Sequence, residues 1–234
     1  MNTMKTDYFD IEDYYAEKKK YCITFFKRAA RHGRRAVIKK YGSAKGNRIL
    51  DRVKTDFENL LPKIPYVGEI DILQRQMLLT AIFLSFYRVL KDEENIGNIW
   101  SLCNNFNRET LMNMPGLIRK FLKMSTFSKR MKSRFKKQAE VHKRENLADQ
   151  WDYVEGDGAT FDYGMNMKKC AKLIFLKNMG AEEFAPYVCL IDKNFAECCH
   201  YGLKRTRVLA EGADYCDFRL SKNGPVEVST SVNL

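Results

Sequence analysis

Apolar residues in the first part of the chain recur every three or four positions, which is the spacing of a helix that buries one face. Between residues 10 and 60 they include Ile23, Phe26 and Ala30, which lie among charged and polar side chains. Prolines and a glycine in LPKIPYVG then interrupt the pattern. We therefore predict helices on both sides of this segment.

The most apolar run of the chain extends from Met77 to Leu90 and contains Arg88. It is shorter than the roughly 20 apolar residues that a membrane-spanning helix needs. A buried helix from about Ile70 to Lys91 fits this run better, and no association with a membrane is expected.

The strongly basic segment 129–144 carries Met131, Phe135 and Ala139 as a thin apolar stripe at helical spacing. This pattern favours a solvated helix that packs through one narrow face over an arm that binds nucleic acid. Because no aromatic platform or recognised nucleic-acid motif lies among these charges, nucleic acid is not an expected partner.

Alternation replaces the helical spacing beyond Trp151. Phe161, Tyr163, Met165 and Met167 occupy every second position, which is typical of a half-buried strand. Glycines lie between this run and the preceding WDYVEG. A hairpin or two short strands are therefore predicted.

Two helices and two further strands are predicted after this hairpin. The first helix, Lys168 to Met179, ends at Gly180 in the usual position of a left-handed cap, and the second begins at Ala181. The segments LKRTRVLA and YCDFRL then alternate again, which predicts two antiparallel strands joined by a short loop.

The predicted class is α+β, with a largely helical N-terminal part and with a small antiparallel sheet and two helices in the C-terminal part. We expect a single domain. It divides into a mainly helical, basic segment 1–145, an α+β segment 146–222 and a loose tail 223–234.

Composition supports a folded, globular chain of 234 residues, of which 45% are hydrophobic and 30% charged. The net charge of +12 is unevenly distributed. Residues 1–144 hold 31 Lys and Arg against 15 Asp and Glu, whereas residues 145–234 hold 10 against 14. The charge asymmetry raises the possibility of an anionic partner for the first part alone.

The chain has seven cysteines, an odd number, and no CxxC pair. Its start lacks the apolar core of a signal peptide, so reduced thiols in the cytoplasm are expected. Cys198, Cys199 and His200 are consecutive, and adjacent residues rarely point at one ion. We therefore expect neither a metal nor another cofactor.

The second predicted C-terminal helix brings a thiol close to a carboxylate. Cys189 and Asp192 lie one turn apart on one face, with His200 near the helix end, and such a set can serve as nucleophile and base. Cys189 taken alone fits a small buried hydrophobe better than a nucleophile. Asp192 lies in the apolar context YVCLID and needs a partner if it is buried.

On the last predicted strand, Cys216 and Phe218 share one face, and Asp217 and Arg219 share the other. The first pair is predicted to belong to the core. The second pair is either a solvated ion pair or part of a pocket. In such a pocket Arg219 can hold a carboxylate, and Arg205 or Arg207 on the preceding strand can do the same.

The runs CAKLIFLKNMGAEEFAPYVCLIDKNF and LKRTRVLAEGADYCDFRL resemble the L-2-amino-thiazoline-4-carboxylic acid hydrolase family, over about residues 150–220 strongly and over the apolar helix more loosely. Val188 stands where that family is expected to have leucine. The positions that carry the resemblance are Cys170, Gly180, Cys189, Asp192, Arg205, Thr206, Leu209, Gly212, Cys216, Asp217, Phe218 and Arg219.

The resemblance implies an enzyme that hydrolyses a non-peptide C–N bond in a cyclic, amidine-like thiazoline and yields a carbamoyl-cysteine on the route to L-cysteine. Such chemistry needs a nucleophile, a general acid and a cationic anchor for the substrate carboxylate. On this basis Cys189 is the nucleophile, or a wall of the site if water attacks, and Asp192 is the base or the partner of the amidine. Arg205 or Arg219 holds the carboxylate, and Asp217 orients that arginine.

His200 and Cys170 are the accessory candidates of this site. A more distant likeness, in the Gly…Cys-x-Phe ending, is to vinyl-reductase-type small-molecule sensor domains. It leaves open the alternative of a ligand-binding module without catalysis. In either case the expected partner is a small molecule that carries a carboxylate.

Overall fold

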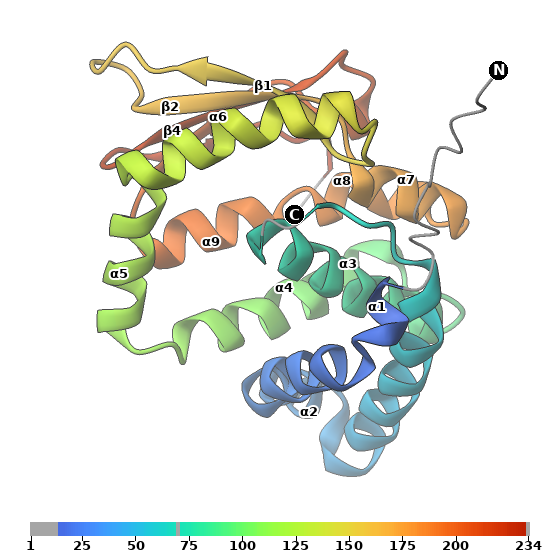
Figure 1. The fold of residues 1–234 in the computed structure, drawn as a ribbon. Helices are drawn as coiled ribbons and strands as arrows, with labels where there is room; N and C mark the ends of the chain where they lie inside the picture. Colours follow the sequence, from blue (N-terminus) through green and yellow to red (C-terminus); the bar gives the residue numbers. More distant parts are fainter. Residues whose placement is uncertain (1–13, 69–70, 233–234) are drawn as a thin grey trace, which may run out of the picture.

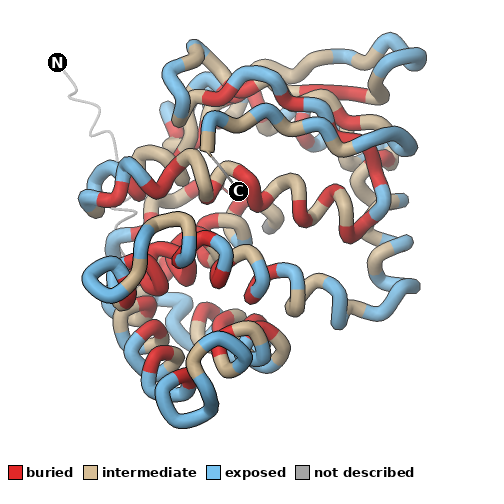
Figure 2. Tube along the Cα trace, turned by 180° about the vertical axis from the view of Figure 1, so that it is seen from behind, coloured by how far each residue is buried: buried red, intermediate tan, exposed pale blue. Residues whose placement is uncertain are grey.

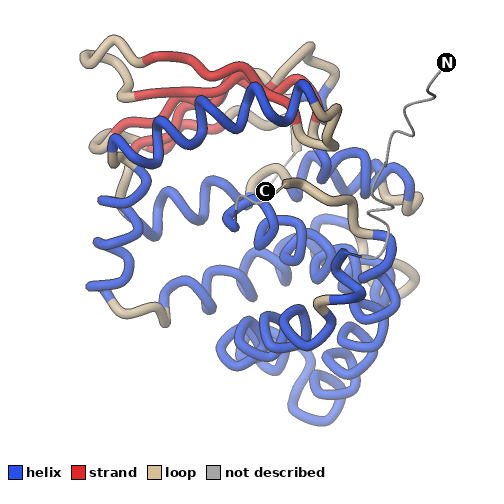
Figure 3. Tube along the Cα trace, in the orientation of Figure 1, coloured by secondary structure: helices blue, strands red, loops and turns tan. Residues whose placement is uncertain are grey.

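The computed structural model describes residues 14–68 and 71–232 (Figure 1). Figure 3 shows the strands gathered in one layer and helices in the rest of the molecule, so the predicted α+β class is confirmed. The helices are α1 (Tyr14–Glu17), α2 (Lys19–Leu60), α3 (Asp71–Leu90), α4 (Ile96–Met112), α5 (Gly116–Thr126), α6 (Lys129–Arg144), α7 (Ala171–Asn178), α8 (Ala185–Val188) and α9 (Ile191–Cys199), with 3-10 turns η2 (Leu61–Lys63), η3 (Glu182–Phe184) and η4 (Leu209–Glu211). The strands are β1 (Gln150–Glu155), β2 (Tyr163–Lys169), β3 (Gly202–Arg205), β4 (Cys216–Ser221) and β5 (Val226–Val228).

Helix α2 is folded back on itself at Gly42, whose φ of 74° lies in the left-handed region that favours glycine. The two arms face each other, and the rings of Phe26 and Phe57 stack with their centroids 5.5 Å apart. Gly33 on the first arm allows a close approach to α4, because a Cβ there would overlap the ring of Phe106. The helical part is thus built on α2 packed against α3 and α4.

Helix α3 is buried along most of its length, as its apolar run predicts. Leu78, Ile82, Phe83 and Phe86 are completely inaccessible to solvent. In the part of the chain that the structure describes, no helix combines the length and apolar character required to cross a membrane.

The five strands form one sheet in the order β1-β2-β4-β3-β5. The strands β1, β2, β4 and β3 pair in antiparallel fashion, whereas β5 pairs in parallel with β3, so that Leu203 lies beside Val226. The sheet is therefore mixed, and the expectation of an antiparallel sheet is corrected. The difference arises because residues 226–228, which we expected to lie in a loose tail, supply its last strand.

One face of the sheet is directed toward the helices, and we call it the inner face. Register places Met165 beside Phe218 and Met167 beside Cys216 on this face. Helix α6 covers the β1 side of the sheet and α9 lies under β3 and β5 (Figure 1). Phe135 and Ala139 of α6 are buried, which confirms the predicted narrow apolar stripe.

The second predicted C-terminal helix is broken into η3, α8 and α9. In a continuous helix, the N–H of Lys193 would donate to the carbonyl of Cys189, four residues earlier. Instead it donates to Leu190 O at 3.2 Å, and the Cys189 carbonyl is left free for another partner. Gly180 has a φ of 66°, which matches its predicted left-handed position.

Candidate functional site

A cavity of about 300 Å³ lies between the inner face of the sheet and the surrounding helices. Most of its lining is apolar, including Met165, Phe218 and Phe195. Helix α5 contributes to one wall, through residues such as Leu122. Such a cavity, apolar with a few polar groups, is typical of small-molecule sites. The polar or charged side chains that line it include Gln76, Asp149, Lys172, Asp192 and Arg205.

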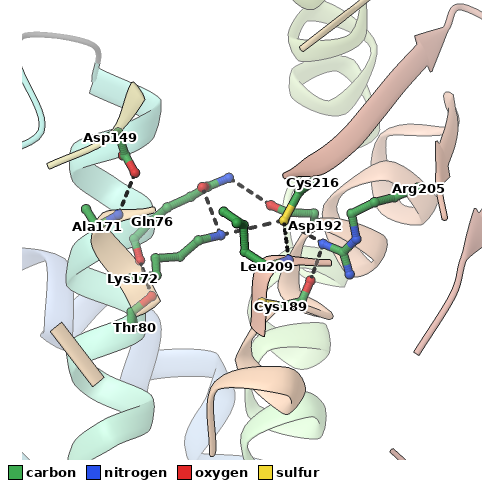
Figure 4. Close-up of polar contacts among 10 residues, drawn as sticks. All are labelled: Gln76, Thr80, Asp149, Ala171, Lys172, Cys189, Asp192, Arg205, Leu209 and Cys216. Carbon is green, nitrogen blue, oxygen red and sulfur yellow. Dashed lines mark hydrogen bonds and ion pairs between the residues drawn. The ribbon is translucent and has the colours of Figure 1, made fainter. Parts of the chain in front are cut away.

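Asp192 is the centre of a buried polar cluster in this cavity (Figure 4). Its Oδ2 lies 3.6 Å from Nζ of Lys172 and 3.5 Å from Nη1 of Arg205. Its Oδ1 accepts a hydrogen bond of 3.1 Å from Nε2 of Gln76. Gln76 also accepts a bond from Lys172 at 3.4 Å, which closes the cluster.

The four members of this cluster come from four elements, and each is placed by local structure. Gln76 lies on α3, and Lys172 is the second residue of α7. Asp192 lies in the first turn of α9. Arg205 ends β3, where alternation directs it, like Leu203, to the inner face.

The cluster is shielded from solvent and carries more positive than negative charge. The side chains of Lys172, Asp192 and Arg205 are exposed to 14%, 13% and 1%, respectively. Burial alone would lower the pKa of Lys172, but Asp192 and the other acidic groups around it, Cys170, Cys189 and Asp149, together outweigh this effect and the pKa is raised. Two fixed cations thus face one ion-paired carboxylate, and such a site attracts an anionic ligand.

Arg205 is held in place by main chain and by an aromatic ring. Its Nη1 donates to the carbonyl of Cys189 at 2.9 Å, the carbonyl that the break between α8 and α9 leaves free. Its guanidinium carbon lies 5.3 Å from the ring centroid of Phe218. Its Nε is buried and, among the described residues, has no hydrogen-bond partner.

Three thiols line the cavity, those of Cys170, Cys189 and Cys216. Burial raises the pKa of Cys189 to about 11 and that of Cys170 to about 12. Burial also raises the pKa of Cys216, whose sulfur accepts the N–H of Leu209 at 3.2 Å. These thiols are therefore protonated near neutral pH, whereas a nucleophilic cysteine reacts as its thiolate.

Asp149 is a second carboxylate at the cavity, and it is only 5% exposed. Its Oδ1 accepts the backbone N–H of Ala171 at 2.7 Å. Its own carbonyl accepts a bond of 2.9 Å from Nδ1 of the buried His142. Burial raises the pKa of Asp149, and this effect outweighs the hydrogen bond and the nearby charges that lower it.

The structure brings four of the sequence-predicted residues together. Cys170, Cys189, Asp192 and Arg205 all line the cavity. Cys189 follows α8 rather than lying within one long helix with Asp192, yet both still face the same space. The prediction that Cys189 and Asp192 lie near each other therefore holds, although the continuous helix on which it was based is broken.

Three other predicted residues, Asp217, Arg219 and His200, do not line the cavity. Asp217 accepts the backbone N–H groups of Thr206 and Arg207 at 2.8 and 2.6 Å, so it fixes a loop rather than orienting a site arginine. Arg219 donates to Asn166 at 2.9 Å on the opposite face of the sheet.

His200 does not join the site either, because its left-handed backbone (φ 56°) ends α9 and its side chain is exposed. Cys216 and Phe218 pack in the core, as the alternation predicted, and they also line the cavity. The alternation was therefore predicted correctly, whereas the face that borders the cavity was not.

Sequence reasoning missed Gln76, Asp149 and Lys172. The sequence contained a weak signal for Lys172, since it is the single cation in the apolar segment CAKLIFL. Asp149 immediately precedes a strand, where carboxylates are also common as solvated loop residues. Within the described residues, no group of three or more His, Cys, Asp or Glu side chains is placed to hold a metal ion.

The family model described as L-2-amino-thiazoline-4-carboxylic acid hydrolase matches residues 72–220. The chain belongs to this family. The match extends from α3 to β4 and includes all five polar side chains of the cavity described above. No curated protein and no solved structure matches the chain. Membership in the L-2-amino-thiazoline-4-carboxylic acid hydrolase family supports a hydrolase-like function.

Proposed function

We propose that this protein hydrolyses a non-peptide C–N bond in a cyclic amidine that carries a carboxylate. In the form that its family suggests, 2-amino-thiazoline-4-carboxylate is opened to a carbamoyl-cysteine. The observation that carries this proposal is the buried cluster of Lys172, Asp192 and Arg205 at the edge of a cavity of about 300 Å³.

The substrate carboxylate is assigned to Lys172 and Arg205. Asp192 neutralises only one of these two cations, and the buried Nε of Arg205 still lacks an acceptor among the described residues. A carboxylate oxygen can supply that acceptor in a charge-assisted hydrogen bond. Asp192 then acts as the positioning residue that holds both cations toward the ligand.

Water is the proposed nucleophile, and Cys189 forms part of the wall. A thiol with a pKa of about 11 is ionised in roughly one molecule in ten thousand at pH 7. A protonated thiol is a poor nucleophile. The amidine carbon between nitrogen and sulfur is electrophilic enough to be attacked by a water molecule that is positioned beside a base.

The proposal is tested with purified protein and a panel of thiazoline carboxylates, hydantoins and carbamoyl amino acids, with product detected by mass spectrometry. The variant Lys172→Met is expected to raise KM for carboxylate-bearing substrates by at least about 30-fold, because loss of a buried charge contact costs on the order of 2 kcal/mol or more. The matched decarboxylated thiazoline should show a much smaller change. Equal effects on both substrates would contradict the assigned anchor.

A ligand-binding module without catalysis is the second candidate. It is favoured by the protonated state of the three thiols, none of which is poised as a nucleophile. In that case the same panel would give saturable shifts in melting temperature without any product.

A further inference from the structure

The two carboxylates of the cavity differ in their partners. Asp192 is matched by Lys172, Arg205 and Gln76. Asp149 makes no ion pair with any of the described residues, and its side chain accepts a hydrogen bond from the neutral N–H of Ala171. In enzymes, two titratable groups in such unlike environments commonly divide charge stabilisation from proton transfer.

Asp149 is held rigidly although it lacks a cation. Its main chain is fixed by His142, whose ring lies under Trp151 with the centroids 4.5 Å apart. Gly68 leaves room for this histidine, because a Cβ there would lie only 2.7 Å from its Nε2. With Oδ1 engaged by Ala171, the second carboxylate oxygen is the one available to a ligand in the cavity.

Asp149 has titratable or charged neighbours on helices α1, α6, α7 and α9. Among the described residues that affect its pKa most, Lys172 is the permanent cation, and it is already engaged with Asp192. The titratable or charged neighbours are Tyr15 of α1, His142 of α6, Cys170 before α7, Lys172 of α7 and Asp192 of α9.

We propose that Asp149 is the catalytic residue that exchanges protons with the amidine and with the attacking water. This inference rests on the proposed function and deepens it. It assigns a separate task to each carboxylate, because Asp192 holds the cations that bind the substrate and Asp149 serves the reacting ring.

The proton transfers balance as follows. Protonated Asp149 gives its proton to the ring nitrogen of the neutral amidine. Water then adds to the amidine carbon, a C–O bond forms, the π pair of the C=N bond moves to nitrogen, and Asp149 takes the proton that water loses. As the bond between the amidine carbon and the ring nitrogen breaks, its electron pair stays on that nitrogen, which receives the proton from Asp149.

The hydroxyl group on the carbon finally loses its proton to Asp149 as the carbonyl forms. The ring nitrogen has gained two protons, water has supplied both, and Asp149 ends in its starting state. No oxidation or reduction occurs, and no further reactant is needed.

The kinetic test compares Asp149→Asn, Asp149→Glu and the control Asp157→Asn. Asparagine keeps an acceptor for Ala171 but cannot exchange protons, so kcat is expected to fall about 10²- to 10⁴-fold with little change in KM. Glutamate is expected to recover part of kcat. Asp157 also accepts backbone N–H groups, but in the exposed turn between β1 and β2, and its substitution is expected to leave kcat unchanged.

The pH dependence of kcat is a second test, because it would not change on substitution if Asp149 had a purely structural role. The wild-type kcat is expected to fall as pH rises through the raised pKa of Asp149, and Asp149→Asn is expected to lose that limb. An Asp149→Asn variant that melts as a folded protein and keeps wild-type kcat would overturn the inference.

A direct titration separates this inference from the proposed function. Carboxyl carbon NMR of the full chain, with the Asp149 signal assigned by its loss in Asp149→Asn, should show a midpoint well above the ordinary value of about 3.9. A midpoint at or below that value would overturn the role of Asp149, whatever the substrate. If the midpoint is raised but no panel member is hydrolysed, the proposed function fails, and the proton-transfer role fails with it.

Discussion

At the scale of a single residue, the proposed catalytic role of Asp149 is accompanied by a cost in stability. Its pKa is raised in the folded protein, so its charged form is less favourable there than in the unfolded chain. Below the unfolded pKa of about 3.9 both states are protonated, and no penalty arises. As pH rises through the folded pKa, the full penalty develops.

We therefore expect Asp149→Asn to be more stable than the wild type at pH 7, and this gain should shrink toward pH 4. Urea unfolding at both pH values measures the difference. A variant that is equally destabilised at the two pH values would show that the carboxylate contributes mainly through its bond to Ala171.

Cys189 supports a second prediction at this scale. If it is a wall of the site, Cys189→Ala should keep kcat within about tenfold, since the loss of a methylene-sized contact near a ligand is worth about 1–3 kcal/mol in binding. A loss of a thousandfold or more in kcat would instead identify the thiol as the nucleophile. Cys22→Ala, which removes a completely buried thiol on α2, is the control for stability.

Sequence patterns located part of the site at the residue scale. Cys189, Asp192 and Arg205 were found because a carboxylate in an apolar segment and an arginine in an alternating strand are unusual enough to need partners. Gln76 and Asp149 were not found, because neither type is unusual in its local context. Their role follows from tertiary contacts that no local pattern encodes.

At the scale of elements, spacing predicted α3 and the left-handed turn at Gly180, but it did not predict the break between α8 and α9. Pro186 lies in the first turn of α8, a position where helices tolerate proline, so this residue did not indicate that the helix ends after Val188. Strand β5 was missed because three residues carry too little pattern, and its pairing with β3 is not local.

Helix α5 has no buried residue (Figure 2). It holds four of the large apolar side chains that are exposed in the described residues, and Met112, the last residue of α4, is a fifth. They are Met112 at 57%, Leu117 at 80%, Ile118 at 46%, Phe121 at 67% and Met124 at 65% exposure. An apolar group of this size on a surface favours self-association at high protein concentration.

The double variant Leu117→Ser and Phe121→Ser is expected to reduce such association, as measured by light scattering over a concentration series. Its free energy of unfolding should change by no more than about 0.5 kcal/mol per site, because exposed positions contribute little to packing. Leu122→Ser, on the cavity side of the same helix, should lower stability more.

At the scale of the whole molecule, the site joins the two parts of the chain. Gln76 belongs to the helical part, whereas Lys172, Asp192 and Arg205 belong to the C-terminal part. A ligand bound at the cluster therefore contacts elements that are separated by about a hundred residues along the chain, and its binding energy stabilises all of them together.

A carboxylate-bearing substrate analogue is expected to raise the melting temperature and to slow hydrogen exchange in α3, α7 and β3 at the same time. At a ligand concentration of 100 times Kd, the expected stabilisation is about 2.7 kcal/mol. Lys172→Met should weaken both effects. Protection confined to α7 would show that the ligand does not bridge the two parts.

The carbonyl of Cys189 gives the site a tolerance to mutation. Arg205 is anchored there by a main-chain oxygen, which every amino acid provides, and not by a side chain that substitution can remove. A substitution at position 189 is thus expected to change the shape of the cavity while the arginine stays in place.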